Sequence, residues 1–329
     1  MPRRWPWGAQ RVADERATRA DRDAGASDVT RGQPLAIDRL NDLLIVAPFK
    51  EWLRTLHLDS LDALFAVPGE ASLHKPGLGG WRERVRIEPT ECSASDPRGE
   101  VGLTRPATLY LKRFSNPPAQ GRRLVRDARN GARSVAEVEW NWLHCCWREG
   151  LPCPMPVAMG SEFRGGRERR SALLMSAVAG QSLERGLAAA HAPDRPTLRT
   201  LLDATADLVK RFHRGGLVHR DLYCSHVFYD RDAGGNLSLR LIDFQRVLRP
   251  VRGRARWIVK DLASLHYSAP AGVVTRTDRL RWLKRYLGLP KLDAPAKVLA
   301  WQVVGKTARI ARHDRRRMAR LRAAGEGTA

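Results

Sequence analysis

Two aspartates end neighbouring apolar segments that have the pattern of short strands. The first, Asp221, follows a segment that begins at Leu217, and the second, Asp243, follows another that begins at Leu237. Residues 230–236 between them are typical of a turn, so the two segments can pair as a hairpin with both carboxylates at one edge. Such a pair suits phosphoryl transfer, in which one carboxylate orients the attacking hydroxyl and the other holds Mg²⁺ against nucleotide phosphates.

A lysine further upstream could supply the positive charge that phosphates require. Lys112 lies within residues 107–114, whose alternating pattern predicts a strand. Glu139 stands beside the apolar stripe of a helix predicted over residues 134–149. A carboxylate at such a position needs a partner, and an ion pair with Lys112 would fix the ammonium group beside the phosphates.

The order and spacing of these residues resemble the protein-kinase superfamily. Residues 219–221, His-Arg-Asp, match the H-R-D of the catalytic loop, and residues 242–244, Ile-Asp-Phe, stand where D-F-G would be. The resemblance implies an α+β, bilobal protein-kinase-like fold that uses ATP and Mg²⁺, with an antiparallel-sheet N-lobe and a mainly helical C-lobe. It also implies that Asp221 is the catalytic base, Asp243 the Mg²⁺ ligand and Lys112 the phosphate-binding lysine.

Two departures from the superfamily pattern narrow the resemblance. His226 stands where an Asn would bind the second Mg²⁺, and Gln245 replaces the Gly that follows the Phe. Both departures, together with residues 260–268 and 278–286, look like the lipopolysaccharide core kinases that phosphorylate Kdo or heptose. For His226 two interpretations stay open, a second metal-side group or a packed core histidine.

The same resemblance implies roles for several other residues. Glu139 would be the partner of the phosphate-binding lysine, and Asp261 would brace the catalytic loop from below. The phosphate-covering loop would contain Gly77, Gly79 and Gly80, just before a strand predicted over residues 81–88, although this segment does not match G-x-G-x-x-G.

Domain boundaries follow from the changes in pattern along the chain. We predict a tail over residues 1–33, a helical extension over 34–71, the N-lobe over 72–178 and the C-lobe over 179–329. Apolar spacing within residues 33–65 favours two short helices in the extension. The C-lobe ends in a basic helix.

Composition limits the classes of partner. The 329-residue chain has a net charge of +23, which attracts anionic membrane surfaces, polyanionic substrates and nucleic acid alike. By the resemblance, the expected partner is a lipopolysaccharide core or lipid A-linked sugar, and no specific nucleic acid is expected. Residues 297–322 could form a basic helix that lies on an anionic membrane, a solvated tail on the C-lobe or a tail that contacts RNA.

Targeting signals and cysteines favour the cytoplasm. No apolar run approaches the ~18 residues of a membrane span, and residues 1–32 lack a secretory signal pattern. The five cysteines have no paired C-x-x-C spacing, which is typical of reduced thiols. We therefore expect a cytoplasmic protein that could bind the inner face of the inner membrane.

Three rival functions are less consistent with the sequence. A protein Ser/Thr kinase would need a longer peptide-docking segment than the 18 positions between Asp243 and Asp261, and no Ala-Pro-Glu occurs. An aminoglycoside-type phosphotransferase would keep Asn where His226 stands. A non-catalytic kinase-like scaffold would not need Lys112 and Asp221 together with Asp243.

Overall fold

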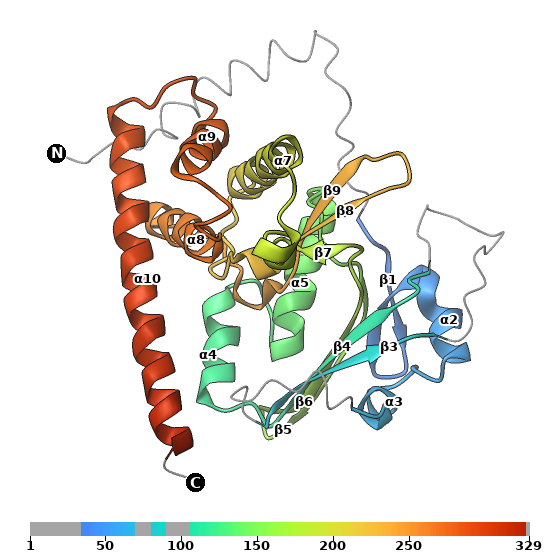
Figure 1. Cartoon of the computed structure of the whole chain (residues 1–329). Helices are drawn as coiled ribbons and strands as arrows, with labels where there is room; N and C mark the ends of the chain where they lie inside the picture. The colour runs from blue at the N-terminus through green and yellow to red at the C-terminus, as the bar shows by residue number, and fades with distance from the viewer. Residues whose placement is uncertain (1–33, 70–79, 90–104, 327–329) are drawn as a thin grey trace. The chain divides into compact units, whose positions relative to one another are not determined.

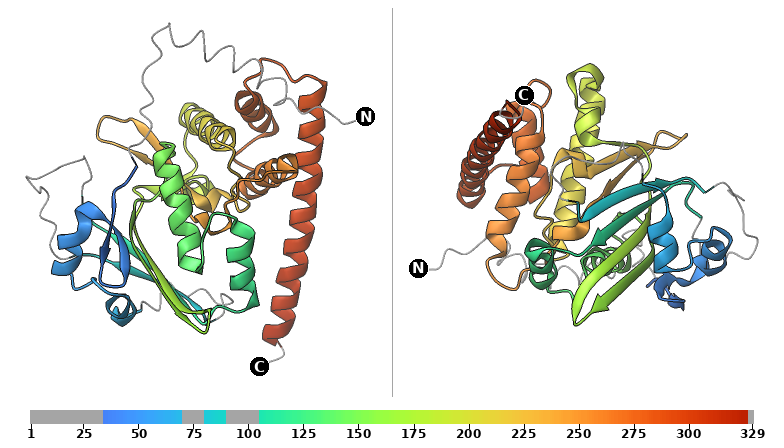
Figure 2. Two further views of the ribbon diagram at one scale, coloured as in Figure 1. Left: turned by 180° about the vertical axis from the view of Figure 1, so that it is seen from behind. Right: turned by 90° about the horizontal axis from the view of Figure 1, so that it is seen from below.

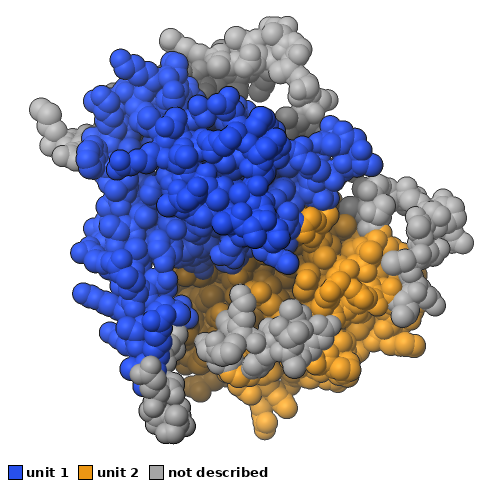
Figure 3. Space-filling model, viewed as in Figure 1, with its two compact units in different colours: residues 1–30, 181–239, 249–329 blue, residues 31–180, 240–248 orange. Residues whose placement is uncertain are grey.

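The computed structural model describes residues 34–69, 80–89 and 105–326, and these form two compact units (Figures 1 and 3). The first unit, drawn in orange and keyed as unit 2 in Figure 3, contains the described residues through Gly180 together with Arg240–Leu248. The second contains Gln181–Leu239 and the described residues from Arg249 onward. The division after Gly180 lies close to residue 178, the predicted end of the N-lobe.

An antiparallel sheet organises the first unit. Among the described residues it has six strands, in the order β1-β2-β5-β6-β4-β3. They are β1 (Ile37–Leu40), β2 (Leu43–Val46), β3 (Arg82–Ile87), β4 (Leu109–Ser115), β5 (Pro156–Arg164) and β6 (Arg167–Ser176). Neighbouring strands in this order pair antiparallel, as predicted for an N-lobe.

Helices cover both faces of this sheet. They are η1 (Ala47–Phe49), α2 (Lys50–Thr55), α3 (Leu61–Ala66), α4 (Ala119–Ala128) and α5 (Val135–Arg148). Successive strand residues point to opposite faces. Lys112 accordingly reaches Glu139 on α5, whereas Arg113 donates hydrogen bonds of 2.7 Å to the carbonyls of Phe65 and Val67 at the end of α3. Figure 2 shows the sheet between these two helical layers.

The N-terminal extension is only partly helical. The prediction of two short helices within residues 33–65 is confirmed by α2 and α3 but is wrong for β1 and β2. Leucines at 40, 43 and 44 suit a helix face, yet Asn41 adopts a left-handed conformation with a φ of 53° and turns the chain. Leu40 then pairs directly with Leu43, and β2 extends the sheet beside β5.

The second unit is mainly helical, in agreement with the predicted C-lobe. Its elements are β7 (Gln181–Ser182), α6 (Leu183–Gly186), η3 (Ala189–His191), α7 (Arg195–Arg214), η4 (Cys224–His226), β8 (Val227–Arg231), the start of β9 (Leu237–Leu241), α8 (Arg254–Ser268), α9 (Arg276–Leu287) and α10 (Ala294–Glu326). Helix α7 packs against α9, and α8 packs against α10. None of the described helices has both the length and the apolar character to cross a bilayer.

One segment departs from the predicted domain boundaries. We expected an uninterrupted C-lobe from residue 179, but Arg240–Leu248 belong to the first unit. The Leu241 amide donates to the Pro152 carbonyl at 3.0 Å, and the Phe244 amide donates to Glu139 Oε1 at 3.1 Å. These bonds hold η5 (Phe244–Arg246) within the first unit.

The second unit also contains an apolar cavity of about 270 Å³ that is partly open to solvent. Side chains of α7, α8, α9 and α10 line it, together with Leu183, Leu187 and Cys224. None of the predicted site residues lines this cavity, so it is separate from the expected phosphoryl-transfer chemistry.

Candidate active site

Lys112 on β4 and Glu139 on α5 form a buried ion pair in the first unit. The Lys112 ammonium lies 2.7 Å from both carboxylate oxygens, and the two side chains are only 9% and 1% exposed. Glu139 Oε1 also accepts the hydrogen bond from the Phe244 amide. One buried carboxylate therefore fixes both the lysine and the backbone that follows Asp243.

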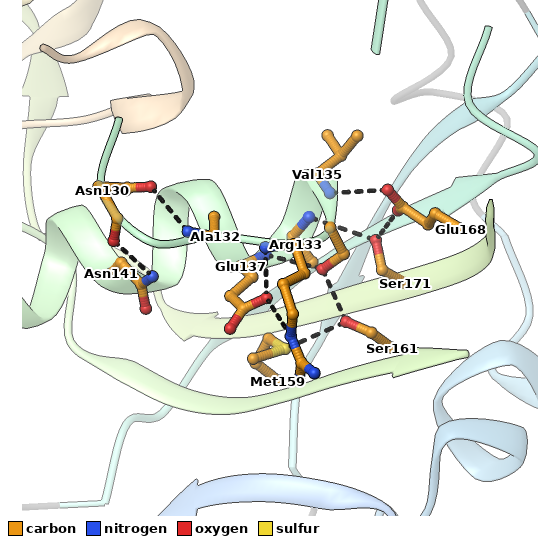
Figure 4. A network of polar contacts seen from close by, with 12 residues as sticks. Asn130, Ala132, Arg133, Val135, Glu137, Asn141, Met159, Ser161, Glu168 and Ser171 are labelled. Atoms are coloured by element: carbon orange, nitrogen blue, oxygen red, sulfur yellow. Dashed lines mark hydrogen bonds and ion pairs between the residues drawn. The ribbon is translucent and has the colours of Figure 1, made fainter. Parts of the chain in front are cut away.

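Polar contacts tie the start of α5 to strands β5 and β6 (Figure 4). The N-cap residue, Ser134, has its hydroxyl 2.7 Å from that of Ser161 on β5. From β6, Glu168 accepts a hydrogen bond of 3.0 Å from the Val135 amide. Because these contacts anchor the first turn of the helix, they determine where Glu139, one turn later, meets the sheet.

Asp243 lies beside two cations of the same unit. Its Oδ1 is 3.4 Å from Lys112 Nζ, and its Oδ2 is 3.6 Å from Arg84 Nη2. The Asp243 backbone is left-handed, with a φ of 65°, a conformation that is uncommon outside glycine and concentrates at functional sites. The carboxylate keeps 25% exposure, so a ligand can approach it.

This donor set fits Mg²⁺ and nucleotide phosphates. Proteins usually bind Mg²⁺ through one or two carboxylates, and substrate phosphates and waters complete the coordination. Asp243 supplies such a carboxylate, and Lys112 and Arg84 supply positive charge for phosphate. Within the described ranges, no group of three or more His, Cys, Asp or Glu side chains could hold a metal without other ligands. A Mg²⁺ site whose coordination is completed by phosphates does not need such a group.

Asp221 lies in the loop between α7 and η4 of the second unit. Its Oδ1 is 3.5 Å from Lys260 Nζ on α8, and the two side chains are 23% and 20% exposed. The preceding residue, Arg220, has a left-handed backbone with a φ of 68°. His226 Nδ1 lies 2.7 Å from the Asp221 carbonyl, to which it can donate. A metal-side role for His226 stays a prediction.

Asp261 on α8 braces this loop from a fully buried position. Its Oδ2 accepts from the His219 amide at 2.6 Å, and its Oδ1 accepts from the Arg220 amide at 2.7 Å. His213 bridges Asp261 Oδ2, 3.2 Å from its Nε2, and the Tyr286 hydroxyl, 2.8 Å from its Nδ1. Burial raises the pKa of Tyr286, so its hydroxyl stays protonated and can donate to Nδ1. The bracing role predicted for Asp261 is confirmed.

The predicted site residues fall into one group in each unit. The first unit brings together Lys112, Glu139 and Asp243, and the second brings together Asp221 and His226. Of the glycines predicted for the phosphate-covering loop, Gly80 lies in the turn before β3, with open space where a side chain would be. Gly77 and Gly79 lie outside the described residues.

Two charged residues beside the aspartates were not predicted as site residues. Arg84 is one of the alternating arginines of β3, and Lys260 directly precedes Asp261. The alternating arginines indicated a basic face of this strand. Only the register of the sheet shows that Arg84 lies directly opposite Lys112.

Comparison with known proteins gives a consistent family. The model of the lipopolysaccharide kinase (Kdo/WaaP) family matches residues 119–286. This range includes Glu139, Asp221 and Asp243 but begins after Lys112. The match therefore covers about half of the chain and most of the candidate site.

Similar proteins include kinases of two inner-core sugars. The lipopolysaccharide core heptose(I) kinase WaaP of Pseudomonas aeruginosa is 37% identical over 116 residues, 33% of this chain and 43% of that protein. The Escherichia coli protein of the same name is 30% identical over 164 residues, 48% of this chain and 62% of that protein. Both alignments thus span less than two thirds of the WaaP length. The 3-deoxy-D-manno-octulosonic acid kinase of Xanthomonas axonopodis pv. citri is 31% identical over 202 residues, 60% of this chain and 74% of that protein.

A solved structure shares the fold. It is described as WaaP in complex with acyl carrier protein, and it superposes with a TM-score of 0.55 at 24% identity. The superposition covers 80% of this chain and 97% of that one. The protein-kinase-like fold expected from the sequence is therefore confirmed.

Proposed function

The chain belongs to the lipopolysaccharide kinase (Kdo/WaaP) family, and on that premise we propose that it transfers a phosphoryl group from ATP to a hydroxyl of a Kdo or heptose sugar in the lipopolysaccharide inner core. The observation that carries this proposal is the cluster of Lys112, Glu139 and Asp243, which supplies a fixed ammonium group and a carboxylate 3.4 Å apart. Relatives named as kinases of these two sugars support the choice of acceptor.

In this proposal, one group of residues binds the phosphates and another binds the acceptor sugar. When bound, ATP would supply the phosphoryl group, and Mg²⁺ would offset the negative charge of the phosphates. Asp243 would hold the metal, and Lys112, fixed by Glu139, would bind phosphate oxygens. Asp221 would orient the sugar hydroxyl and accept its proton, with Lys260 balancing the charge of the carboxylate. Most of the rate acceleration would then come from positioning and from electrostatic stabilisation.

The acceptor assignment is tested with the purified full chain, ATP, Mg²⁺ and delipidated lipopolysaccharide cores that lack core phosphate. We expect mass spectrometry to show a gain of one phosphate on Kdo or heptose. Asp221→Asn should slow this gain by about 10²- to 10⁴-fold, the usual contribution of a general base, while ATP still binds. Asp232→Asn, in the exposed turn between β8 and β9, is the matched control and should retain activity.

Two outcomes would contradict parts of this proposal. If the wild type binds ATP but adds no phosphate to any core sugar, the acceptor is another small molecule or the chain is a scaffold. If Asp221→Asn phosphorylates the core at the wild-type rate, Asp221 is not the base.

We also propose that the enzyme works on the cytoplasmic face of the inner membrane, to which α10 would bind. Buried residues of α10, among them Leu299 and Val303, pack on one side of the helix. Its outward apolar residues include Trp301, which is 77% exposed, with Val298 and Val304. Exposed basic residues accompany them: Lys297, Arg309, Arg312, Arg315, Arg316, Arg317, Arg320 and Arg322. An aromatic anchor with many cations is typical of helices that bind anionic lipid surfaces.

Co-sedimentation with phosphatidylglycerol-containing vesicles tests this surface. Because each cation near an anionic surface contributes about 1 kcal/mol, Arg315→Gln/Arg316→Gln/Arg317→Gln should weaken binding by about 100-fold. Trp301→Ser should weaken it further, and vesicles of phosphatidylcholine alone should bind poorly. Val251→Ser, at an exposed apolar residue outside α10, is the control. Equal binding by all variants would exclude α10 as the membrane surface.

A further inference from the structure

Arg84 and Lys112 occupy directly opposed positions on neighbouring strands. In the antiparallel pair of β3 and β4, Arg84 is the register partner of Lys112. Directly opposed residues of such a pair project from the same face of the sheet. Both cations also lie near Asp243, at 3.6 Å and 3.4 Å from different oxygens of its carboxylate. The guanidinium and the ammonium group therefore each lie beside a different oxygen of the same carboxylate.

Positive charge exceeds negative charge around Asp243. Arg82, two residues before Arg84 and on the same face of β3, holds its guanidinium 4.0 Å from the centre of the Trp81 ring. Its Nε is shielded from solvent and has no hydrogen-bond partner among the described residues. Burial lowers the pKa of Arg82, attraction to Asp243 opposes this change, and repulsion from Arg84 and Arg246 reinforces it. A site with more guanidinium groups than carboxylates favours an anionic ligand.

We infer that Arg84, assisted by Arg82, binds the polyphosphate of the nucleotide. The inference rests on the proposed use of ATP and names an additional binding group for it. A guanidinium group presents paired donors that match two phosphate oxygens, which a lysine cannot do. In the absence of nucleotide, the Asp243 carboxylate forms an ion pair with the Arg84 guanidinium. Metal and phosphate together would release this pair, because the carboxylate then binds the cation and the guanidinium binds the anion.

Nucleotide binding to the full chain, measured by titration calorimetry with Mg²⁺, tests the inference without any acceptor sugar. ATP, ADP and adenosine are the probes. Charge-assisted hydrogen bonds of this kind contribute roughly 1.5–3 kcal/mol, so Arg84→Gln should weaken ATP binding by about 10- to 100-fold. The loss should be smaller for ADP and absent for adenosine. Arg84→Lys should restore only part of the ATP affinity.

Arg86→Gln is the matched control. Arg86 lies on the same strand and the same face, but its side chain pairs with Glu88. Its substitution should leave all three affinities unchanged. Thermal melting without nucleotide should show that Arg84→Gln remains folded, since the Arg84 side chain is 41% exposed.

The outcomes separate this inference from the proposed function. Unchanged ATP affinity in Arg84→Gln, with normal ATP binding by the wild type, would overturn the inference alone. An equal loss for ATP and adenosine would also overturn it, because that pattern indicates a structural role. A wild-type protein that binds no adenine nucleotide would overturn both.

Discussion

At the residue scale, the Glu139 carboxylate is the acceptor that holds the candidate site of the first unit together. It is buried and receives hydrogen bonds from Lys112 and from the Phe244 amide. Removing one partner of a buried ion pair typically costs about 3–5 kcal/mol, because the remaining charge is left without compensation. We therefore expect Lys112→Met to lower the free energy of unfolding by about that amount, measured by urea denaturation.

A second substitution isolates the charge effect. Lys112→Met/Glu139→Gln removes both charges but keeps an acceptor for the Phe244 amide. The double variant should be more stable than Lys112→Met alone. If it is less stable, the cost of Lys112→Met comes from lost packing of the lysine stem rather than from an unpaired carboxylate.

At the element scale, one buried carboxylate links α7 to α9. Asp278 completes a capping box with Thr275 at the start of α9, and both its oxygens lie 2.8 Å from Arg195 Nη2 at the start of α7. Burial alone would raise the pKa of Asp278, but hydrogen bonds from Arg195 and Thr275 outweigh it and lower the pKa to about 2. Helix α9 therefore depends on an ionised Asp278.

The pH dependence follows from the sign of this shift. Because the folded pKa lies below the unfolded value of about 3.9, the contribution is complete above pH 4 and is lost as the pH falls toward 2. Asp278→Asn should lower the free energy of unfolding at pH 7 by about 2 kcal/mol and flatten its decline between pH 4 and 2, measured by urea titration. Asp207→Asn is the control, since its pair with Arg285 also joins α7 to α9 but is half exposed. An equal loss in the free energy of unfolding for both variants would mean that the burial of Asp278 adds nothing to the strength of its interactions.

Helices and strands were predictable from the sequence where the apolar residues fitted the period of a helix or of a strand but not both. Helix α5 was predictable from its apolar stripe, and that stripe also drew attention to Glu139. The β1-β2 hairpin was not predictable, because Leu40 and Leu43 suit a helix until Asn41 turns the chain. Arg84 was missed for a related reason, since its position opposite Lys112 depends on sheet register, which residue types alone do not determine.

At the scale of the whole molecule, each unit contains a half-buried histidine whose pKa is lowered. Burial lowers the pKa of His144 in the first unit to about 4. Burial and repulsion from Arg279 lower the pKa of His266 in the second unit to about 4. In each case one ring nitrogen is shielded and has no hydrogen-bond partner in the described part of the chain. Protonation of either histidine therefore destabilises the unit that contains it.

The consequence is a loss of stability in weak acid. Between pH 6.5 and 4 the unfolded chain binds more protons at these histidines than the folded chain, so the free energy of unfolding falls as the pH drops through this window. Because solvent screens both half-buried rings, each histidine should contribute less to this loss than the ~3 kcal/mol of a fully buried group. Urea titrations from pH 7.5 to 4.5 should show this slope, and His144→Gln or His266→Gln should each reduce it. His191→Gln, at an exposed histidine, should not; a slope unchanged in all three variants would assign the acid sensitivity to other groups.

The return of Arg240–Leu248 to the first unit has a consequence for synthesis on the ribosome. Domains usually fold in order as the chain emerges, the N-terminal one first. Here the strands and α5 of the first unit can assemble early, but the Phe244 amide that donates to Glu139 is made only after the whole of α7, β8 and β9. Asp243 is delivered with it. The nascent first unit therefore lacks Asp243 until more than sixty residues beyond Gly180 have been translated. A polypeptide released before that point cannot bring Lys112, Glu139 and Asp243 together.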